Sequence, residues 1–499
     1  MVQAAPEPPA RPAAGATWAD QLMARPWGSP AVVAAGGVWT TADLLRAAAG
    51  AARAMDEAGL PPGVPVPALL WSSPEALALV VAGALGGRPV APLGPLLTPS
   101  ELAACLDGLG AEALVVQPTT RPRGEEVAAL TGHRLVDLAD ADASAERAAP
   151  TLVGPWHADD VAVVLHTSGT SGAPTRVELR QRHLAARTPV VASLLELGPG
   201  DRYVTAKPIH HIGGLGLTLA ALGAGAAVLP FPRFTPAAWR ALAELRPTHA
   251  SVVPSMVEVL LPAGELALPG LRLLQYGGAP IHPDTLATVV ERHPELDLVA
   301  LYGQTEGSPL AALSPAEHRR AVGGDRRLLT SAGRAAPGVE LVIEDEDADG
   351  VGEVAARAAH VIRPDDDGWL RTGDLGRIDA DGYLHLVGRR GDVINRGGEN
   401  VHPREVEEVL AAHPGVVEVA VAAVEDRRLG QAVGAWVVRH GGPGAPPSDD
   451  ELRQWARARL AGFKVPEVWH GVEALPRNAA GKVVRRQLPR AGEAVAEGR

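Results

Sequence analysis

The residues best suited to chemistry form a run of small polar side chains directly after an apolar stretch. Val163–Leu165 leads to His166, and the next six residues are all Gly, Ser or Thr. Glycines let backbone amides approach an anion, and hydroxyls add donors with little bulk. A flexible surface turn is the alternative, and the Gly-Lys-Ser/Thr ending of a Walker loop is absent. The run predicts a phosphate-binding loop built from Thr167, Ser168, Gly169, Thr170, Ser171 and Gly172.

Further motifs follow in chain order, most of them after apolar runs. They are KPIHHIGG (207–214), QYGGAP (275–280), LYGQTEG (301–307), WLRTGDLG (369–376), GRRGDVI (388–394), GGENVHPREVE (397–407) and LPRNAAGK (475–482). Together with the loop, this ordered set resembles the adenylate-forming superfamily, which includes acyl- and aryl-CoA ligases, peptide-synthetase adenylation domains and beetle luciferases. The resemblance covers about residues 75–490.

The resemblance implies a nucleotide site that takes ATP, or acyl-AMP, with Mg²⁺. A hard cation on a carboxylate would neutralise phosphate charge, and an aspartate at a strand end can accept both ribose hydroxyls. Solvated charges and an Asx turn are the plainer alternatives. The implied roles are adenine contact for Gly278, Ala279 and Pro280; pocket lining for Tyr302, Gly303 and Gln304; a phosphate donor at Thr305; the magnesium ligand at Glu306; ribose binding by Asp374; nucleotide contact by Arg389; and a cation against the carboxylate and α-phosphate at Lys482.

An acid-binding pocket is implied by the same resemblance. His211 would gate the carboxylate, Gly213 and Gly214 would leave room for the acyl group, and Tyr276 and Gly277 would border it. An ordinary histidine in a capped turn is the alternative. Because no Asp stands where amino-acid-activating domains pair a substrate ammonium, we expect an acid without an α-amino group. With 3 Phe, 4 Tyr and 10 Trp in the chain, we expect aliphatic side chains and glycine backbone to line the pocket.

The C-terminal motifs imply a mobile CoA-binding part. Gly397, Gly398, Glu399 and Lys464 would lie on the CoA side, and Gly391 would be the hinge because glycine leaves φ and ψ unrestricted. The small domain would then rotate between two half-reactions, withdrawing Lys482 and bringing the 397–400 segment to the thiol.

One departure from the family pattern concerns the phosphate loop. The lysine that normally follows its proline is replaced by Thr175, and Arg176 comes next. A missing cation would weaken the hold on the β- and γ-phosphates, and arginine would replace it imperfectly. A CoA synthetase is the favoured function. A thioesterification-only enzyme that receives acyl-AMP from a partner adenylating enzyme, and one that loads a separate carrier protein, remain alternatives. The presence of Glu306 and Lys482 argues against a non-catalytic adenylate-binding regulator.

The positioning elements belong to an α/β protein. Short apolar runs (162–165, 251–253, 271–275, 298–301) alternate with longer amphipathic stretches, which indicates parallel sheets. At 499 residues, two or more domains are expected. We predict a disordered tail at 1–16, a large N-terminal domain of parallel and mixed sheets with helices at 17–390, and a small α+β domain at 391–499 joined by a hinge. The latter should contain helices at 403–412 and 449–460 and strands at 416–424 and 432–438, after a hairpin turn at Asp379–Gly382.

The composition of the chain limits the kinds of partner that it is expected to bind. The net charge of −12 argues against a nucleic-acid or membrane-surface partner. A single cysteine, Cys105, excludes an intrachain disulfide and a cysteine zinc site and suits the reducing cytoplasm. The uncharged stretch 212–232 contains five glycines and ends among prolines, so we interpret it as a buried helix and strand rather than a membrane span. The expected partner is a small carboxylic acid, and a homodimer remains open.

Overall fold

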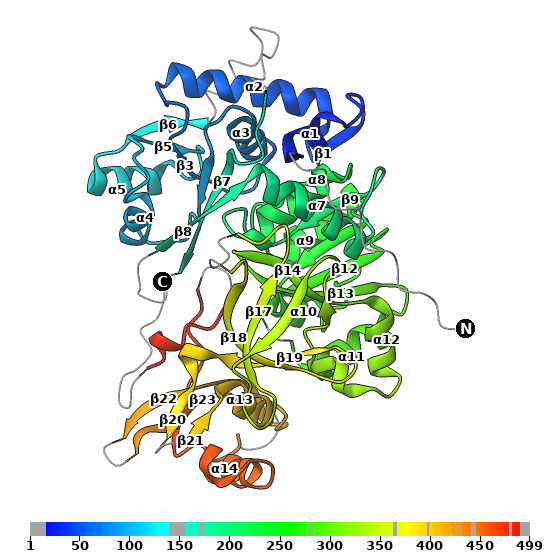
Figure 1. Ribbon diagram of the computed structural model, residues 1–499, viewed down its shortest axis with the longest axis vertical. Helices are drawn as coiled ribbons and strands as arrows, with labels where there is room; N and C mark the ends of the chain where they lie inside the picture. The colour runs from blue at the N-terminus through cyan, green and yellow to red at the C-terminus, as the bar shows by residue number, and fades with distance from the viewer. Residues whose placement is uncertain are drawn as a thin grey trace. The chain divides into compact units, whose positions relative to one another are not determined.

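The computed structural model describes residues 16–138, 155–168, 174–279, 281–362, 367–396, 399–426, 429–440, 446–478 and 482–489. Apart from Ala16, the predicted tail lies outside these residues. The chain divides into two compact units, residues 1–341 with 356–370 and residues 342–355 with 371–499 (Figure 1). The fold is α/β, with a large N-terminal part and a smaller C-terminal part, as predicted. The predicted domain boundary between residues 390 and 391 stays a prediction.

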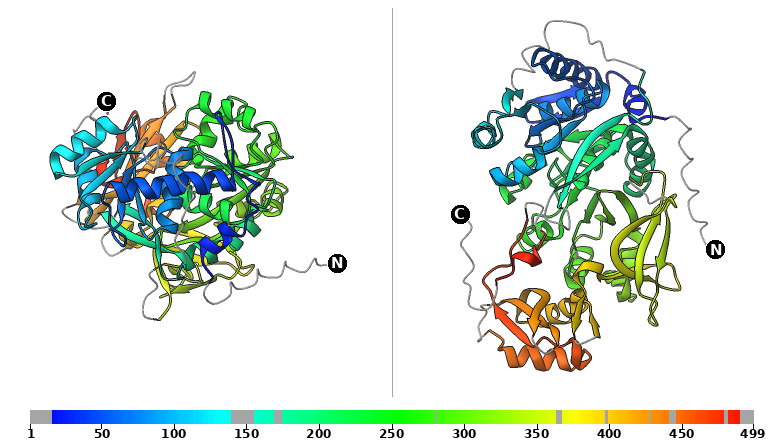
Figure 2. Two further views of the ribbon diagram at one scale, coloured as in Figure 1. Left: turned by 90° about the horizontal axis from the view of Figure 1, so that it is seen from above. Right: turned by 60° about the vertical axis from the view of Figure 1, so that its left-hand side comes forward.

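A six-stranded sheet opens the first unit, in the order β6-β5-β3-β4-β7-β8. Its pairings are parallel except for the β7–β8 hairpin, the teal pair of long strands in Figure 2. The strands are β3 (Val66–Leu69), β4 (Val90–Leu93), β5 (Ala113–Val116), β6 (Arg134–Asp137), β7 (Val161–Ser168) and β8 (Pro174–Arg180), and the neighbouring helices in sequence are α2 (Thr41–Glu57), α3 (Pro74–Leu85), α4 (Pro99–Leu106) and α5 (Arg121–Thr131).

Local sequence explains where these helices begin. Ser73 caps α3 by accepting from the Ala76 amide, and Thr98 forms a capping box with Glu101 at the start of α4. Each helix has proline in its first turn, where the missing N–H costs nothing. All residues of β3, β4 and β5 are buried, as expected for parallel strands covered on both faces.

A nine-stranded sheet forms the rest of the first unit among the described residues, in the order β15-β14-β13-β12-β11-β9-β10-β1-β2. Its centre is parallel. The strands are β1 (Pro30–Ala34), β2 (Gly37–Thr40), β9 (Arg202–Thr205), β10 (Ala227–Leu229), β11 (His249–Val252), β12 (Leu273–Gly277), β13 (Asp297–Gln304), β14 (Gly307–Leu313) and β15 (Arg334–Ala335); the helices are α1 (Trp18–Met23), α7 (Gln181–Leu195), α8 (Leu217–Gly223), α9 (Pro236–Ala241), α10 (Pro254–Leu260), α11 (Pro283–Arg292) and α12 (Pro315–Val322), with η2 (Ile212–Gly216), η3 (Leu242–Leu245) and η4 (Arg326–Thr330) as short turns.

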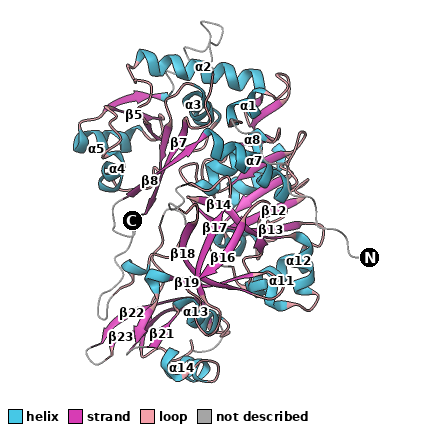
Figure 3. Ribbon diagram, viewed as in Figure 1, coloured by secondary structure: helices cyan, strands magenta, loops and turns pink. Residues whose placement is uncertain are grey.

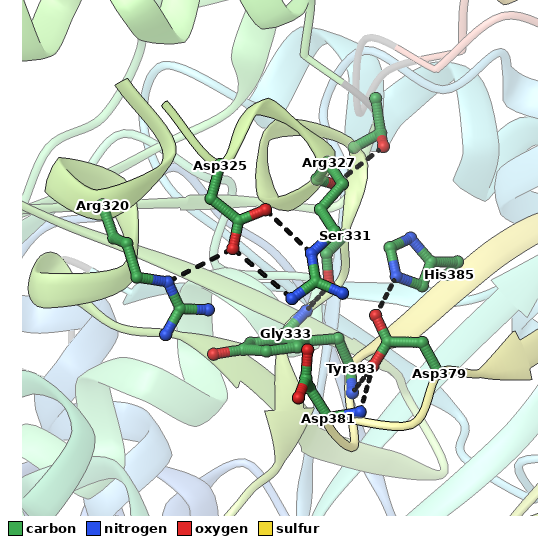
Figure 4. Close-up of polar contacts among 10 residues, drawn as sticks. Arg320, Asp325, Arg327, Ser331, Gly333, Asp379, Asp381, Tyr383 and His385 are labelled. Carbon is green, nitrogen blue, oxygen red and sulfur yellow. Dashed lines mark hydrogen bonds and ion pairs between the residues drawn. The ribbon is translucent and has the colours of Figure 1, made fainter. Parts of the chain in front are cut away.

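The uncharged stretch 212–232 lies inside this unit. It forms η2, α8 and β10, and Leu219 and Val228 are buried, which confirms the predicted helix and strand. Across the described residues, no helix combines the length and the apolar character that a membrane crossing needs. On the outer helices, polar side chains pair with one another; Asp325, for example, accepts from Arg320 and Arg327 (Figure 4).

The second unit contains two further sheets, shown as magenta arrows in Figure 3. A four-stranded sheet has the order β16-β17-β18-β19 and continues into a short turn, η5; a five-stranded sheet has the path β21-β20-β23-β22 with β24 paired to β23. The elements are β16 (Glu340–Glu344), β17 (Gly352–Arg357), β18 (Leu370–Ile378), β19 (Leu384–Arg389), η5 (Arg390–Asp392), β20 (Ile394–Arg396), β21 (Glu399–Val401), α13 (Pro403–Ala411), β22 (Val416–Asp426), β23 (Gly430–Arg439), α14 (Asp449–Arg457), η6 (Gly462–Lys464), β24 (Val468–Gly471) and η7 (Arg485–Gln487).

The predicted hairpin turn at Asp379–Gly382 joins β18 and β19. The Asp379 carboxylate accepts from the amides of Asp381 and Tyr383 and pairs with His385 Nε2 at 2.9 Å (Figure 4). Gly382 adopts φ +84°, which suits glycine. The predicted helices and strands after residue 400 are also confirmed, with α14 ending at Arg457, three residues earlier than expected.

Candidate active site

The predicted phosphate loop joins the two strands of the β7–β8 hairpin. Thr167 pairs with Thr175, and His166 pairs with Arg176 across the ladder. The strand that precedes the loop is therefore confirmed. Gly169, Thr170, Ser171 and Gly172 lie outside the described residues, so their role as phosphate donors stays a prediction.

The two residues that replace the usual lysine project to opposite faces of β8, because neighbouring side chains of a strand alternate. Thr175 lies opposite Thr167, whose hydroxyl is 3.4 Å from the Thr175 carbonyl oxygen. The Arg176 guanidinium donates to the Gly108 carbonyl at 3.2 Å and lies 3.5 Å from a Glu178 oxygen. Arg176 is thus engaged on the face away from Thr175.

The motif with the predicted magnesium ligand forms a tight turn between β13 and β14. Gln304 pairs with Gly307, so Thr305 and Glu306 are the two turn residues. The Glu306 carbonyl accepts from the Ile362 amide at 2.6 Å, which fixes the turn. A Cβ on Gly303 would lie 2.6 Å from the Gly307 carbonyl oxygen, so the turn requires glycine there.

The adenine-site glycines lie at the end of the next strand. Gly277 pairs with Leu301 of β13, and Gly278 adopts φ +91° directly after β12, with Ala279 next. Pro280 lies outside the described residues. The carboxyl ends of β12 and β13 therefore carry the predicted nucleotide residues Gly278, Ala279 and Tyr302–Glu306 side by side, the usual place for a ligand in a parallel sheet.

The predicted acyl-pocket motif makes a π-helical turn. His211 precedes η2, and its ring centroid is 4.2 Å from that of His210. His210 is buried, and burial with the neighbouring His211 holds its pKa well below the ordinary value, so the ring is neutral. A Cβ on Gly214 would lie 2.1 Å from the Pro208 carbonyl oxygen. The lack of a side chain at Gly214 therefore allows the backbone of this turn to pack against Pro208.

Tyr276 contacts α12. Its hydroxyl is 2.9 Å from His318 Nε2, and His318 Nδ1 is 2.8 Å from the Ser314 carbonyl. Because Nδ1 must donate to that carbonyl, Nε2 accepts from the tyrosine. Burial lowers the pKa of His318 to about 4, which keeps the ring neutral. Gln275, the preceding residue of β12, projects to the opposite face.

Lys207 and Gln275 form a buried polar contact that sequence reasoning missed. Lys207 Nζ donates to Gln275 Oε1 at 2.9 Å, and Ser251 Oγ donates to the same oxygen. Lys207 is 8% exposed and Gln275 1%. The predicted pocket lining of aliphatic side chains and glycine backbone did not include these buried polar groups. The sequence could have pointed to Lys207 because lysine is scarce in this chain, which contains only three lysines among 46 basic residues.

Three predicted residues come together on the second unit. Arg389 Nε donates to Asp374 Oδ1 at 2.7 Å, across the β18–β19 ladder. The Lys482 amide donates to Asn478 Oδ1 at 2.9 Å in a C-terminal turn. Lys482 is an exposed residue, and partial desolvation of its ammonium, followed by the charge of Arg389, lowers its pKa below the ordinary value, while Asp374 raises it. Asp374, Arg389 and Lys482 thus share one electrostatic neighbourhood.

The neighbouring residues hold this cluster in place. The Asp374 amide donates to Thr372 Oγ1 at 3.1 Å, and that hydroxyl donates to the Val354 carbonyl at 2.7 Å. Glu353 accepts from the Gly373 amide at 3.0 Å and from Arg390 at 3.0 Å. The backbone around Asp374 is therefore held by contacts from β17 and β18, and its carboxylate is held by Arg389 of β19.

The residues predicted for the hinge and the CoA side are also on this unit. Gly391 lies in η5, and a Cβ there would meet no atom within 4 Å. Lys464 Nζ contacts both oxygens of Glu405, at 2.7 and 2.8 Å. Glu399 lies in β21, paired with Arg396. Gly397 and Gly398 lie outside the described residues, and all four CoA-side assignments stay predictions.

Glu306 is the residue predicted to bind a metal ion. Among the described residues, no group of three or more His, Cys, Asp and Glu side chains is placed to hold a metal ion. Glu306 alone suits Mg²⁺, which keeps waters and phosphate oxygens as its other ligands. An open depression of about 450 Å³ in the second unit, lined among others by Val342, Glu346 and Arg377, contains none of the predicted site residues.

Comparison with known proteins decides the family. Residues 18–364 match the model described as AMP-binding enzyme, and residues 405–482 match the AMP-binding enzyme C-terminal domain. The chain belongs to the AMP-binding enzyme family. The predicted superfamily and the prediction of an adenylate-forming ligase are thereby confirmed.

Three relatives of this chain illustrate the range of activities found in the family. A fatty acid–[acyl-carrier-protein] ligase, ScoC, of Streptomyces coeruleorubidus is 33% identical over 497 residues, covering 92% of this chain and 93% of that protein. The amide bond synthetase McbA of Marinactinospora thermotolerans has a TM-score of 0.83 at 32% identity, covering 94% and 98%. The o-succinylbenzoate coenzyme A synthetase MenE of Bacillus subtilis, solved with ATP and magnesium, has a TM-score of 0.82 at 27% identity, covering 95% and 99%.

Proposed function

We propose that the chain is an acyl-CoA synthetase that activates a carboxylic acid without an α-amino group through an acyl-AMP intermediate. The observation that supports this most is the cluster of Asp374, Arg389 and Lys482, three residues from distant motifs whose charges lie close enough to influence one another. An aspartate that accepts from the ribose hydroxyls and two cations that neutralise phosphate charge suit the binding of an acyl-adenylate. ATP, CoA and Mg²⁺ are the cofactors that the family and its relatives suggest.

In the first half-reaction, a substrate carboxylate oxygen attacks the α-phosphorus of ATP and pyrophosphate leaves. The nucleophile belongs to the substrate, so the protein contributes position and charge. Lys482 faces the charge that develops on the α-phosphate, and Asp374 accepts from the ribose. His211 borders the carboxylate. Glu306 would hold Mg²⁺, which supplies neutralisation of the phosphate charge.

In the second half-reaction, the thiol sulfur attacks the acyl carbonyl carbon and AMP leaves. Gly391 is the pivot about which the part of the chain after it, residues 391–499, rotates and exchanges Lys482 for the 397–400 segment. Lys464 is held by Glu405 on the CoA side, so the pantetheine arm approaches beside a fixed ion pair.

A thioesterification-only enzyme is the second candidate, and a specific observation favours it. Arg176 is committed to Gly108 and Glu178, on the face of β8 away from Thr175. The place of the usual phosphate-loop lysine is therefore left to a hydroxyl. Such an enzyme would take acyl-AMP from a partner adenylating enzyme. A carrier-protein acceptor is a further alternative that the ScoC relative supports. The cytoplasmic location and a homodimer stay predictions.

The test is a panel of carboxylic acids, each assayed separately for ATP-dependent pyrophosphate release and for thioester formation. Acceptors are CoA, a phosphopantetheinyl carrier protein and a simple amine. Release of pyrophosphate followed by acyl-CoA supports the synthetase. Thioester formed only from synthetic acyl-AMP supports the second candidate. Failure to bind any non-hydrolysable acyl-adenylate mimic contradicts both.

A further inference from the structure

Arg485 lies in η7, on the segment 482–489 that begins with Lys482, and it contacts three other elements of the second unit. Its Nη2 donates to both carboxylate oxygens of Glu407 in α13, at 2.7 and 2.9 Å. Its Nη1 donates to Asp392 Oδ2 in η5 at 3.1 Å, and its Nε donates to the Val421 carbonyl in β22 at 3.1 Å. One guanidinium therefore joins the segment that carries Lys482 to a helix, a strand and a turn.

The contacts with α13 and β22 close on one another. β22 stands at the end of the strand order of its sheet, so its outward backbone groups can meet side chains. The Val421 amide donates to Glu407 Oε1 at 2.8 Å, while the Val421 carbonyl accepts from Arg485. The Arg485 and Glu407 side chains are 32% and 18% exposed, so water screens this ion pair less than one on the open surface. Arg485 is thus a fixed point of the second unit.

Lys482 is close to this fixed point along the chain. Its amide donates to Asn478 Oδ1 at 2.9 Å, its carbonyl accepts from the Asn478 amide at 2.9 Å, and the Val484 amide donates to the Pro476 carbonyl at 2.8 Å. The backbone on either side of Lys482 is therefore held locally. Three residues of chain span at most about 11 Å, so the place where Arg485 is held limits where the Lys482 backbone can lie.

Apolar contacts support the same segment. Leu475 and Leu488 belong to one buried cluster with Trp436 of β23, and Trp436 Nε1 donates to the Pro489 carbonyl at 2.8 Å. These contacts do not involve the guanidinium of Arg485. We therefore expect the loss of that guanidinium to displace the start of the segment and to leave its end in place.

The contact with Asp392 places Arg485 beside the proposed pivot. Asp392 follows Gly391 directly and accepts from Arg485. On the other side of Gly391, Arg390 Nη1 lies 3.0 Å from Glu353 Oε2 of β17. The two neighbours of Gly391 are therefore tied to different elements. A rotation at this glycine would leave Arg390 with the four-stranded sheet and would carry Asp392 and Arg485 together.

We infer that Arg485 is a positioning residue for Lys482, which anchors the segment 482–489 to Asp392 and Glu407 so that the segment moves as one body with the chain after Gly391. The inference rests on the proposed function for one point, the use of Lys482 in adenylation. An arginine that only stabilised α13 and β22 would, when lost, impair both half-reactions alike.

The first measurement needs no activity. The chain contains only three lysines, so reductive methylation with isotope-labelled formaldehyde gives few lysine signals in an NMR spectrum, which Lys464→Arg and Lys482→Arg assign. Partial desolvation, followed by Arg389, holds the pKa of Lys482 below its ordinary value of 10.5. In Arg485→Met the start of the segment is released, so the pKa of Lys482 should rise towards 10.5 and its signal should narrow. The signal of Lys464 should not change, and the matched variant Arg486→Met, at an exposed neighbour, should behave as wild type.

The second measurement separates the half-reactions. In Arg485→Met, a displaced lysine should lower kcat for acid-dependent pyrophosphate release about 10- to 100-fold. The KM for ATP should stay within about twofold of wild type, and so should thioester formation from synthetic acyl-AMP. Arg485→Lys keeps a cation for Glu407 and should recover part of the loss. In the double variant with Lys482→Met the two losses should not add, because both act through the same lysine.

The outcomes distinguish the anchor from the proposed function. An unchanged pKa and line width of Lys482 in Arg485→Met would overturn the inference, as would equal losses in both half-reactions or additive losses in the double variant. If Lys482 responds in the titration while pyrophosphate release does not change, the anchor stands and the proposed use of Lys482 fails. If the wild-type protein releases no pyrophosphate with any acid, the titration decides. Should Arg485→Met not fold, Asp392→Asn removes one contact and should raise the pKa of Lys482 by a smaller amount, and no rise would overturn the inference.

Discussion

Cations near the proposed site are held differently in the two units. On the second unit they face carboxylates: Arg389 is 2.7 Å from Asp374, and Lys464 is 2.7 Å from Glu405. Each pair is close to neutral as a whole. Such a pair can be rearranged by an incoming ligand with little change in net charge.

In the first unit, two buried cations rest against neutral oxygens. Lys207 donates to the Gln275 amide, and Arg187 Nε donates to the Ser308 carbonyl at 2.5 Å. Arg187 is 3% exposed, and burial lowers its pKa to about 10. Both contacts are hydrogen bonds to uncharged groups, whereas the contacts of Arg389 and Lys464 are ion pairs.

Lys482→Met should produce the largest effect. If this cation meets charge that develops on the α-phosphate, its loss should lower acid-dependent pyrophosphate release by about 100- to 1,000-fold. Thioester formation from synthetic acyl-AMP should stay close to wild type. Rapid-quench assays of the two half-reactions measure this, with exposed Arg486→Met as the control on the same segment. Equal losses in both half-reactions would contradict the assignment.

Lowering the pH should test whether the fold keeps the buried histidines of the first unit neutral. Burial lowers the pKa of His318 and of His360 to about 4, so below the ordinary value of 6.5 the unfolded chain binds protons that the folded chain does not. Stability should therefore fall as pH drops from about 6.5 towards 4, by about 2 kcal/mol per histidine at pH 5.

Urea unfolding at pH 7 and pH 5 measures this dependence. His318→Gln should reduce the loss, whereas the same change at exposed His440 should leave it unaltered. A pH-independent unfolding free energy over this range would show that these rings are not held neutral by the fold.

Asp374→Asn should weaken nucleotide binding. The amide keeps the shape but loses the charge that pairs with Arg389 and would accept from ribose. Hydrogen bonds to charged groups are worth about 1.5–3 kcal/mol, so the KM for ATP should rise about 10- to 100-fold. Steady-state kinetics measures it, with Asp381→Asn in the nearby hairpin turn as the control. An unchanged KM for ATP would show that Asp374 does not bind the ribose.

The sequence predicted one side of this comparison much better than the other. Asp374, Arg389 and Lys482 stand in motifs whose order and spacing carry a strong resemblance. The proximity of Asp374 and Arg389 follows once β18 and β19 pair as the Asp379–Gly382 turn predicts. Lys207, Gln275 and Ser251 come together only through the register of β9, β11 and β12, which are distant in sequence. Parallel register depends on tertiary packing, so local patterns do not reveal it.

Thr175→Lys should raise activity. Thr175 stands at the position of the usual phosphate-loop lysine, so a new ammonium there should strengthen phosphate binding by one charge-assisted hydrogen bond and raise pyrophosphate release about 10-fold. Arg176→Lys, on the opposite face of β8, should give no such gain. If Arg176→Ala abolishes adenylation instead, Arg176 is the replacement cation and the thioesterification-only alternative loses its support.

Gly391→Ala should have the smallest effect on stability and a selective one on turnover. A Cβ at Gly391 meets no atom within 4 Å, so the free energy of unfolding should change by less than about 1 kcal/mol. Alanine nevertheless restricts the backbone at the proposed pivot, so complete turnover should fall while pyrophosphate release is retained. Gly462→Ala is the matched control, because its Cβ also meets open space. If the two variants behave alike in both half-reactions, residues 391–499 do not pivot at Gly391, and the Lys464–Glu405 pair does not need to move relative to the Arg389–Asp374 pair.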